Sequence, residues 1–425
     1  MEKIIVRGSN RLFGEIDVQG SKNSSLPILA ACVLVDGVSV IHNCPELSDV
    51  DAAVKILEHL GCSVKRENHT LYVDSTNITC YNIPQSLMRE MRSSIVFLGS
   101  LLSRMGKAKM SSPGGCEIGL RPIDLHLSAL SQLGVEIDES YGDIYCEIKN
   151  ELTPAVISLS FPSVGATENI ILASVFAKGR TTILNAAREP EISDLAAFLN
   201  KCGCRVFVKS EGTVIIDGVL KAHAAEHSVM PDRIAALTYM CAVGAAGGDV
   251  KLKNACPQSF LSVIPVFERA GCLIKTDENA LCIKAQKRLS SVRDIRTMPY
   301  PGFPTDAQAP VMAMLCTAKG TSVIVENIFE SRFKHVSELV RMGAKIKIEG
   351  KVAIIDGTES LCGANVSAID LRGGGALVVA ALAAKGETAI SGVKHIDRGY
   401  EKIEACLKAA GADIERREEV NVRGF

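Results

Sequence analysis

The sequence alternates between two hydrophobic periods, one typical of helices and the other of strands. Apolar residues recur at the three- and four-residue spacing of an amphipathic helix at Leu47, Val50, Val54, Leu57 and Leu60. The glycine that follows, Gly61, is a common signal for the end of a helix. Alternating apolar and polar residues come next, so the segment predicts a helix that leads directly into a strand.

This succession of helix, glycine and strand occurs six times along the chain. The glycines concerned are Gly61, Gly134, Gly203, Gly271, Gly343 and Gly411. They recur about every seventy residues, which indicates an internal repeat. Before each of them, another glycine is followed by alternating apolar residues. Each repeat is therefore predicted to contain helix, strand, loop, helix, strand and strand.

Repeats of this length favour closed domains over a linear stack, because solenoid repeats usually have roughly twenty to fifty residues. We therefore expect an α/β (α+β) fold of two domains with three repeats each. The first domain is predicted over residues 22–230, and the second over residues 1–21 and 231–425. The strand-like segment 16–20 belongs to no complete repeat, which suggests that the start of the chain returns to the second half.

Composition limits the possible partners. The net charge is −1 and no basic block occurs, which disfavours nucleic acid and anionic membranes as partners. No apolar segment has the length of a membrane span or signal peptide, so a cytoplasmic protein is predicted. Its 15 cysteines show neither a Cys-x-x-Cys motif nor the spacing of metal ligands. We therefore expect no disulfide framework, no metal site and no cofactor.

The second repeat carries an insertion at residues 111–124, which places Cys116 in a loop rich in glycine and proline. Such a loop cannot join a regular helix or strand, and an insertion present in one of six matched loops is a place to expect function. Most other cysteines lie in apolar segments typical of small buried side chains. Cys116 is therefore the candidate reactive thiol, with burial as the alternative.

Several loops lead into predicted helix N-termini, whose free N–H groups attract anions. Cationic residues near these loops are Lys22, Arg92, Arg121, Arg332, Arg372 and Arg398. Because guanidinium groups match carboxylate and phosphate, the set predicts a ligand with at least two anionic groups. Asp306 is a candidate base and Asp370 stands close to Arg372, although either carboxylate could be a structural ion-pair partner. Motifs for nucleotide hydrolysis and dinucleotide binding are absent.

Several longer motifs carry a family resemblance. They are Gly-Ser-Lys-Asn at 20–23, Pro-Gly-Gly-Cys at 113–116, Ser-Val-Gly-Ala-Thr-Glu-Asn at 163–169, Phe-Pro-Thr-Asp at 303–306, Phe-Glu-Ser-Arg-Phe at 329–333 and His-Ile-Asp-Arg-Gly-Tyr-Glu at 395–401. Through these motifs nearly the whole chain resembles the UDP-N-acetylglucosamine 1-carboxyvinyltransferase family of peptidoglycan synthesis. The resemblance implies a two-domain inverted α/β barrel with its active site in the cleft between the domains. It also implies two small-molecule substrates, phosphoenolpyruvate and UDP-N-acetylglucosamine.

The resemblance also assigns residues. The catalytic residues that it implies are Cys116, Asp306, Lys22 and Arg398. For phosphoenolpyruvate it implies a cradle of Lys22, Arg92, Arg121, Arg332, Arg372 and Arg398. For the UDP-sugar it implies Asn23, Arg121, Pro122, Ile123, Asp124, Leu125, Ser163, Val164, Gly165, Asp306 and Ile328. We add Asp370 to the substrate-binding set.

The implied reaction adds a proton to C3 of phosphoenolpyruvate, so that C2 accepts the sugar 3-hydroxyl. A proton and phosphate then leave. A thiol with a pKa near 8.5 is about 97% protonated at pH 7, so Cys116 can serve as the general acid. The family's covalent adduct and its inactivation by fosfomycin imply that the same sulfur can also be a nucleophile.

Two alternatives remain at this stage. One is the sister enzyme 3-phosphoshikimate 1-carboxyvinyltransferase, which lacks this cysteine loop, and the other is a non-catalytic repeat scaffold. The sequence departs from the family pattern at a few positions. Ser24 and Ser25 stand where alanines are common, and Gly373–Gly375 replace small residues that have side chains. The glycines predict a looser helix start beside Arg372.

Overall fold

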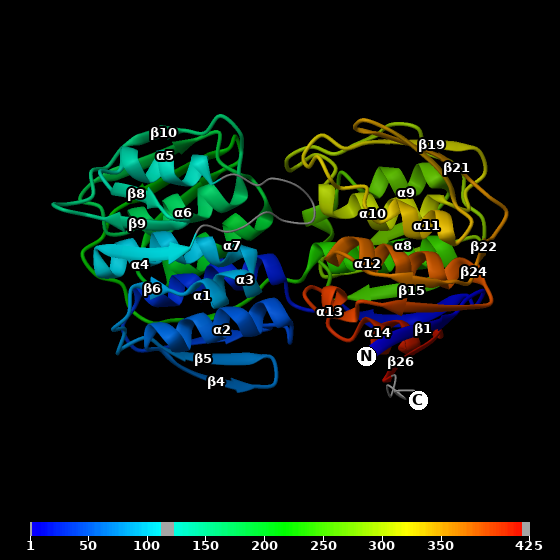
Figure 1. Cartoon of the computed structure of the whole chain (residues 1–425), viewed down its shortest axis with the longest axis horizontal. Helices are drawn as coiled ribbons and strands as arrows, with labels where there is room; N and C mark the ends of the chain where they lie inside the picture. The colour runs from blue at the N-terminus through cyan, green and yellow to red at the C-terminus, as the bar shows by residue number, and fades with distance from the viewer. Residues whose placement is uncertain (1, 112–122, 419–425) are drawn as a thin grey trace. The chain divides into compact units, whose positions relative to one another are not determined.

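The computed structural model describes residues 2–111 and 123–418, except for the side chain of Arg92. The chain forms two compact units (Figure 1). The first unit contains described residues between 20 and 230. The second unit contains residues 2–19 and 231–418.

Three four-stranded sheets surround the first unit. One contains β14 (Glu226–Ser228), β3 (Val38–His42), β5 (Thr70–Asp74) and β4 (Ser63–Glu67). The next contains β6 (Asn82–Ile83), β7 (Lys107–Ser111), β9 (Asp143–Glu147) and β8 (Glu136–Ser140). The last contains β10 (Val156–Ser158), β11 (Arg180–Leu184), β13 (Thr213–Asp217) and β12 (Arg205–Lys209). Each sheet combines antiparallel pairs with one parallel edge strand.

The second unit repeats this plan. Its first sheet contains β2 (Leu12–Asp17), β15 (Gly248–Lys253), β17 (Ala280–Ala285) and β16 (Leu273–Thr276). The next contains β18 (Ile295–Arg296), β19 (Thr321–Val325), β21 (Val352–Asp356) and β20 (Lys345–Glu349). The last contains β23 (Asn365–Ser367), β25 (Glu387–Ser391), β1 (Glu2–Arg7) and β26 (Asp413–Glu418). A short pair joins β22 (Leu361–Cys362) to β24 (Ala384–Lys385).

The N-terminal strands complete two sheets of the second unit. Strand β2 lies parallel to β15, and β1 lies between β25 and β26. The register places Val6 opposite both Thr388 and Ile414, and all three side chains are buried. The start of the chain is therefore held in the core of the second unit.

Central helices fill the interior of each unit. In the first unit they are α1 (Lys22–Ala31), α4 (Phe97–Met105) and α6 (Val164–Ser174), and in the second α8 (Arg233–Ala246), α10 (Thr305–Leu315) and α12 (Leu371–Ala383). All residues of α8 are buried, as expected for a helix that is apolar on every side. Helices inside and sheets outside form the predicted inverted α/β barrel, with three repeats in each unit (Figure 1).

Shorter or amphipathic helices complete the units. They are α2 (Ser48–Leu60), α3 (Gln85–Glu90), α5 (Asp124–Gln132), α7 (Pro190–Lys201), α9 (Ile264–Ala270), α11 (Val336–Arg341), α13 (Val393–Ile396) and α14 (Ile403–Ala409), with 3-10 turns at Cys32–Leu34, Arg92–Val96 and Pro257–Phe260. The six repeat glycines adopt positive φ angles between 85° and 107°. This confirms that they end helices, since a left-handed residue there favours glycine. None of the described helices combines the length and apolar character needed to cross a bilayer.

Candidate active site

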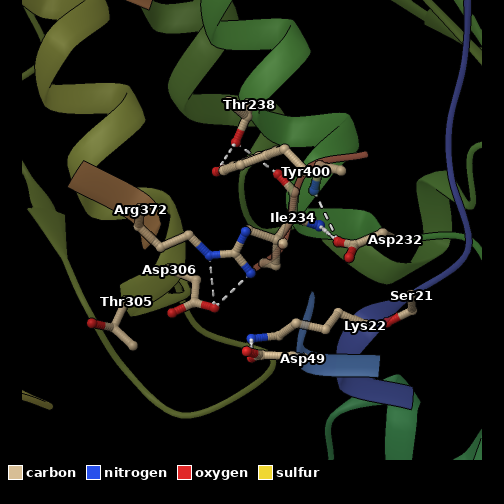
Figure 2. A network of polar contacts seen from close by, with 12 residues as sticks. Ser21, Lys22, Asp49, Asp232, Ile234, Thr238, Thr305, Asp306, Arg372 and Tyr400 are labelled. Carbon is tan, nitrogen blue, oxygen red and sulfur yellow. Dashed lines mark hydrogen bonds and ion pairs between the residues drawn. The ribbon is translucent and has the colours of Figure 1, made fainter. Parts of the chain in front are cut away.

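A carboxylate held by two arginines lies at the start of two central helices in the second unit. Asp306 is in the first turn of α10, and its Oδ1 accepts a hydrogen bond from Arg332 Nη2 at 2.6 Å. The other oxygen, Oδ2, accepts from Nε and Nη2 of Arg372 at 3.1 and 3.0 Å (Figure 2). The structure thus brings together three residues that the sequence analysis selected.

The charge of this cluster is unbalanced. Both arginines are buried, whereas the Asp306 side chain is 28% exposed. Burial alone lowers the pKa of Arg372, but the charge of Asp306 raises it, and the net direction is upward. Arg372 therefore stays protonated. Two arginines share the carboxylate of Asp306, and Arg332 Nε and Arg372 Nη1 have no hydrogen-bond partner among the described residues, so the cluster has guanidinium donors available for an anionic ligand.

The first turn of α12 is well ordered by its contacts. The Asp370 side chain caps the helix by accepting a hydrogen bond from Gly373 N at 2.9 Å. A Cβ added to Gly373 would lie 2.9 Å from His335 Cβ, and one added to Gly375 would lie 2.7 Å from Tyr400 Oη. The glycines thus allow close packing, and the expectation of a looser helix start is corrected by this cap and these contacts.

A buried carboxylate supports the same region. Glu326 accepts hydrogen bonds from the hydroxyls of Thr297 (2.8 Å) and Thr305 (2.9 Å), and from the backbone N–H groups of Ile328 (2.8 Å) and Phe329 (3.1 Å). It therefore fixes both the segment that contains Ile328 and the start of α10. The sequence analysis missed Glu326, although it continues the buried alternation of Ser322 and Ile324 along β19.

The first unit has a cation at the start of α1. Lys22 is buried, and its Nζ lies 3.0 Å from Oδ2 of Asp49, in the first turn of α2 (Figure 2). Ser21 caps α1 by accepting a hydrogen bond from Ser24 N at 3.3 Å. The macrodipole disfavours a cation at a helix N-terminus, so the carboxylate compensates for the position of Lys22. Asp49 was another residue that sequence reasoning missed.

The other site residues predicted in the first unit lie at the starts of α1, α5 and α6. In the first unit, Asn23 lies in the first turn of α1, Ile123 caps α5, and Asp124 and Leu125 begin that helix. Ser163 caps α6, followed by Val164 and Gly165, and a Cβ added to Gly165 would lie 3.0 Å from His126 Cε1 of α5. The starts of α5 and α6 are therefore neighbours.

Arg398, in the second unit, is half-buried in the turn after α13. Cys116, Arg121, Pro122 and the Arg92 side chain lie outside the described residues. Their predicted roles stay predictions, as do those of the other site residues.

Comparisons with known proteins define the class. The family model of EPSP synthase (3-phosphoshikimate 1-carboxyvinyltransferase) matches residues 6–407. The enolpyruvyl transferase NikO from Streptomyces tendae has the same fold, with a TM-score of 0.88 at 23% identity over 98% of each chain. EPSP synthase from Acinetobacter baumannii gives a TM-score of 0.74 at 17% identity, over 98% of this chain and 100% of its own. The fold is that of the enolpyruvyl transferases.

Sequence relatives define the family more narrowly. The chain is 50% identical to UDP-N-acetylglucosamine 1-carboxyvinyltransferase 2 of Caldanaerobacter subterraneus subsp. tengcongensis, over 98% of this chain and 100% of the relative. It is 46% identical to the protein of the same name in Clostridium acetobutylicum, over 99% of this chain and 100% of the relative. The chain belongs to the UDP-N-acetylglucosamine 1-carboxyvinyltransferase family.

Proposed function

We propose that the protein transfers the enolpyruvyl group of phosphoenolpyruvate to the 3-hydroxyl of UDP-N-acetylglucosamine and releases phosphate. This makes it a cytoplasmic enzyme of peptidoglycan synthesis. The observation that carries the proposal is the full-length similarity to relatives of that name at 50% identity. The cluster of Asp306, Arg332 and Arg372 adds chemical support, because it suits a substrate with a phosphate and a carboxylate.

Asp306 is proposed as the base that takes a proton during the reaction. Both of its oxygens accept hydrogen bonds from guanidinium groups, which stabilises the ionised and weakly basic form. An incoming anionic substrate competes with Asp306 for Arg332 and Arg372. When the arginines turn to the substrate, the carboxylate becomes more basic and is free to accept the proton of the sugar hydroxyl.

The remaining cations are proposed to neutralise the same substrate. Lys22, Arg92, Arg121 and Arg398 would share its phosphate and carboxylate with the two buried arginines, which stabilises negative charge as phosphate leaves. Cys116 is proposed to protonate C3. A thiol is mostly protonated near pH 7, whereas an unperturbed carboxylic acid is almost fully ionised.

The test is phosphate release from phosphoenolpyruvate, with UDP-N-acetylglucosamine and with shikimate 3-phosphate as parallel acceptors. The variant Cys116→Ala is compared with Cys362→Ala, which changes an exposed cysteine in β22. We expect release only with the UDP-sugar, loss in Cys116→Ala of at least about a hundredfold, and wild-type rates in Cys362→Ala. Release with shikimate 3-phosphate would favour the sister activity, and release with neither acceptor would contradict enolpyruvyl transfer.

A further inference from the structure

The turn that carries Arg398 is bound by a side chain from the start of the chain. The Arg398 turn, residues 397–402, joins α13 to α14. Gln19 Nε2 donates a hydrogen bond to Gly399 O at 3.2 Å, and Gln19 Oε1 accepts one from Glu401 N at 2.7 Å. One carboxamide, which has both a donor and an acceptor, thus binds two backbone groups of this turn.

The hydrogen bonds within the turn use other backbone groups. Gly399 N and Tyr400 N both donate to Ile396 O, at 3.1 and 3.0 Å. Gly399 is buried, so its carbonyl needs a partner inside the protein, and Gln19 supplies the donor. Removal of the carboxamide would leave this carbonyl without that bond, which favours local opening of the turn.

Gln19 is itself held in place. Its carbonyl oxygen accepts a hydrogen bond from Asp232 N at 2.8 Å, and Asp232 caps the start of α8 (Figure 2). The preceding residue, Val18, is buried, and its N–H donates to Lys253 O at 3.0 Å. The carboxamide of Gln19 therefore projects from a fixed backbone, which makes it an effective anchor for the Arg398 turn.

The Arg398 turn packs on the start of α12. A Cβ added to Gly399 would lie 2.8 Å from both Cδ1 and Cδ2 of Leu371, the first residue of that helix. The next residue is Arg372, which binds Asp306. A displacement of the Arg398 turn would therefore change where Arg398 lies relative to the arginine cluster around Asp306.

A second side chain fixes the residue before Arg398. Arg416, on β26, donates hydrogen bonds to Oδ1 and Oδ2 of Asp397 at 2.7 and 3.0 Å. The residues on either side of Arg398 are thus both bound, Asp397 by Arg416 and Gly399 by Gln19. Because the charged pair with Arg416 is independent of Gln19, loss of the carboxamide should loosen the turn without unfolding it.

We propose that Gln19 is a positioning residue that holds Arg398 in place for the phosphoenolpyruvate anion. This inference rests on the proposed function, because it concerns how Arg398 meets that substrate. Gln19 acts through the backbone of the Arg398 turn, to which both ends of its carboxamide are bound. Removal of the carboxamide should therefore weaken the use of phosphoenolpyruvate selectively.

The test compares Gln19→Met, which removes both hydrogen bonds, with the matched control Asn254→Gly. Asn254 Nδ2 donates to Val18 O at 3.1 Å, and its φ of 51° suits glycine, so the control loosens the same segment at a contact outside the Arg398 turn. We expect kcat/KM for phosphoenolpyruvate to fall about tenfold in Gln19→Met, with less than about a threefold change in KM for UDP-N-acetylglucosamine. A fall in Gln19→Met no larger than that in Asn254→Gly would overturn the inference.

The variant Arg398→Lys shows whether Gln19 acts through Arg398. Lysine keeps the positive charge but lacks the rigid fork of donors, so it depends less on the direction that the turn imposes. When Gln19→Met is added to Arg398→Lys, kcat/KM for phosphoenolpyruvate should fall by less than about threefold. A fall as large as that caused by Gln19→Met alone would mean that Gln19 acts by another route, and would overturn the inference.

Hydrogen–deuterium exchange without substrate separates this inference from the proposed function. We expect the Glu401 amide to exchange at least about tenfold faster in Gln19→Met than in wild type or Asn254→Gly, because Gln19 Oε1 no longer binds it. Unchanged exchange at Glu401 would contradict the inference. If wild type lacks transferase activity, the proposed function fails, while the exchange still decides whether Gln19 holds the Arg398 turn.

Discussion

The two units bury a cation at the start of a central helix in different ways. Lys22 of α1 meets Asp49 from the first turn of α2, and Arg372 of α12 meets Asp306 from the first turn of α10. Both helices have side-chain caps, and both carboxylates occupy the helix end where the macrodipole favours negative charge. The cations stand where the dipole opposes them, so each position depends on a nearby anion.

The difference lies in exposure and in charge balance. The Asp49 side chain is 2% exposed, against 28% for Asp306. Asp306 is also shared with Arg332, so the cluster in the second unit carries more cations than carboxylates. We infer that Asp49 maintains the fold around α1 by compensating the charge of Lys22, which is also one of the cations proposed to bind the substrate. The more accessible cluster around Asp306 is better suited to exchange its carboxylate for a substrate anion.

The largest expected effect comes from breaking the more buried pair. Asp49→Ala leaves Lys22 buried without this carboxylate, which should lower the free energy of unfolding by about 3–5 kcal/mol. Asp306→Ala should cost less than about 3 kcal/mol, because the Asp306 side chain is 28% exposed and solvent screens its interaction with the two buried arginines. Urea unfolding of both variants measures the difference.

A double variant provides the control for this comparison. Lys22→Met combined with Asp49→Leu replaces the buried ions with apolar groups, so it should recover much of the stability lost in Asp49→Ala. If the double variant were as unstable as the single one, charge burial would not explain the loss. Equal losses in Asp49→Ala and Asp306→Ala would remove the distinction between the two units.

The free energy of unfolding is expected to depend on pH through His335, beside the start of α12. His335 is buried against the first turn of α12, and its pKa is lowered to about 4 mainly by burial, with the charge of Asp370 opposing the shift and the charge of Arg332 adding to it. The folded state thus binds this proton less readily than the unfolded chain, whose histidine has a pKa of about 6.5. Unprotonated His335 therefore contributes stability that is present above pH 6.5 and is lost as pH falls toward 4. The free energy of unfolding should fall by about 2 kcal/mol between pH 7 and pH 5 for this reason.

The variant His335→Gln separates this effect from other titrations. Between pH 7 and pH 5 it should lose about 2 kcal/mol less unfolding free energy than the wild type, as measured by urea unfolding at each pH. The control His69→Gln changes an exposed histidine and should follow the wild type. A parallel decline in wild type and His335→Gln would show that His335 is not the group responsible.

Local patterns explain what the sequence could predict. The repeat follows from helix and strand periods and from glycines with positive φ, all of which are read over a few neighbouring residues. Asp306, Arg332 and Arg372 were found because their loops are unusual. Their pairing, and the pairing of Lys22 with Asp49, depends on which helix ends meet in the fold.

Residues that act through packing were the hardest to find. Glu326 was not selected from the sequence, and its importance comes from the partners that the fold brings to it. The glycines of α12 were judged by helix propensity, which does not reveal the contacts of Gly375 with Tyr400. Tertiary contacts therefore decided the outcome where local preference suggested a weak helix start.

The smallest expected effect concerns a hydrogen bond at the start of α1, a helix that contains no glycine. Ser24 Oγ donates a 2.5 Å hydrogen bond to Asp194 Oδ2, which also accepts from Met230 N, while Oδ1 binds His227 Nε2. Ser24→Ala removes one partner but leaves Asp194 with two others, so urea unfolding should show a loss of about 1 kcal/mol. Ser25→Ala is the matched control, because its hydroxyl binds only the neutral carbonyl of Ser21 among the contacts described. A loss in Ser25→Ala as large as that in Ser24→Ala would mean that α1 depends on buried hydroxyls in general, and that Asp194 gives no special support to the start of this helix.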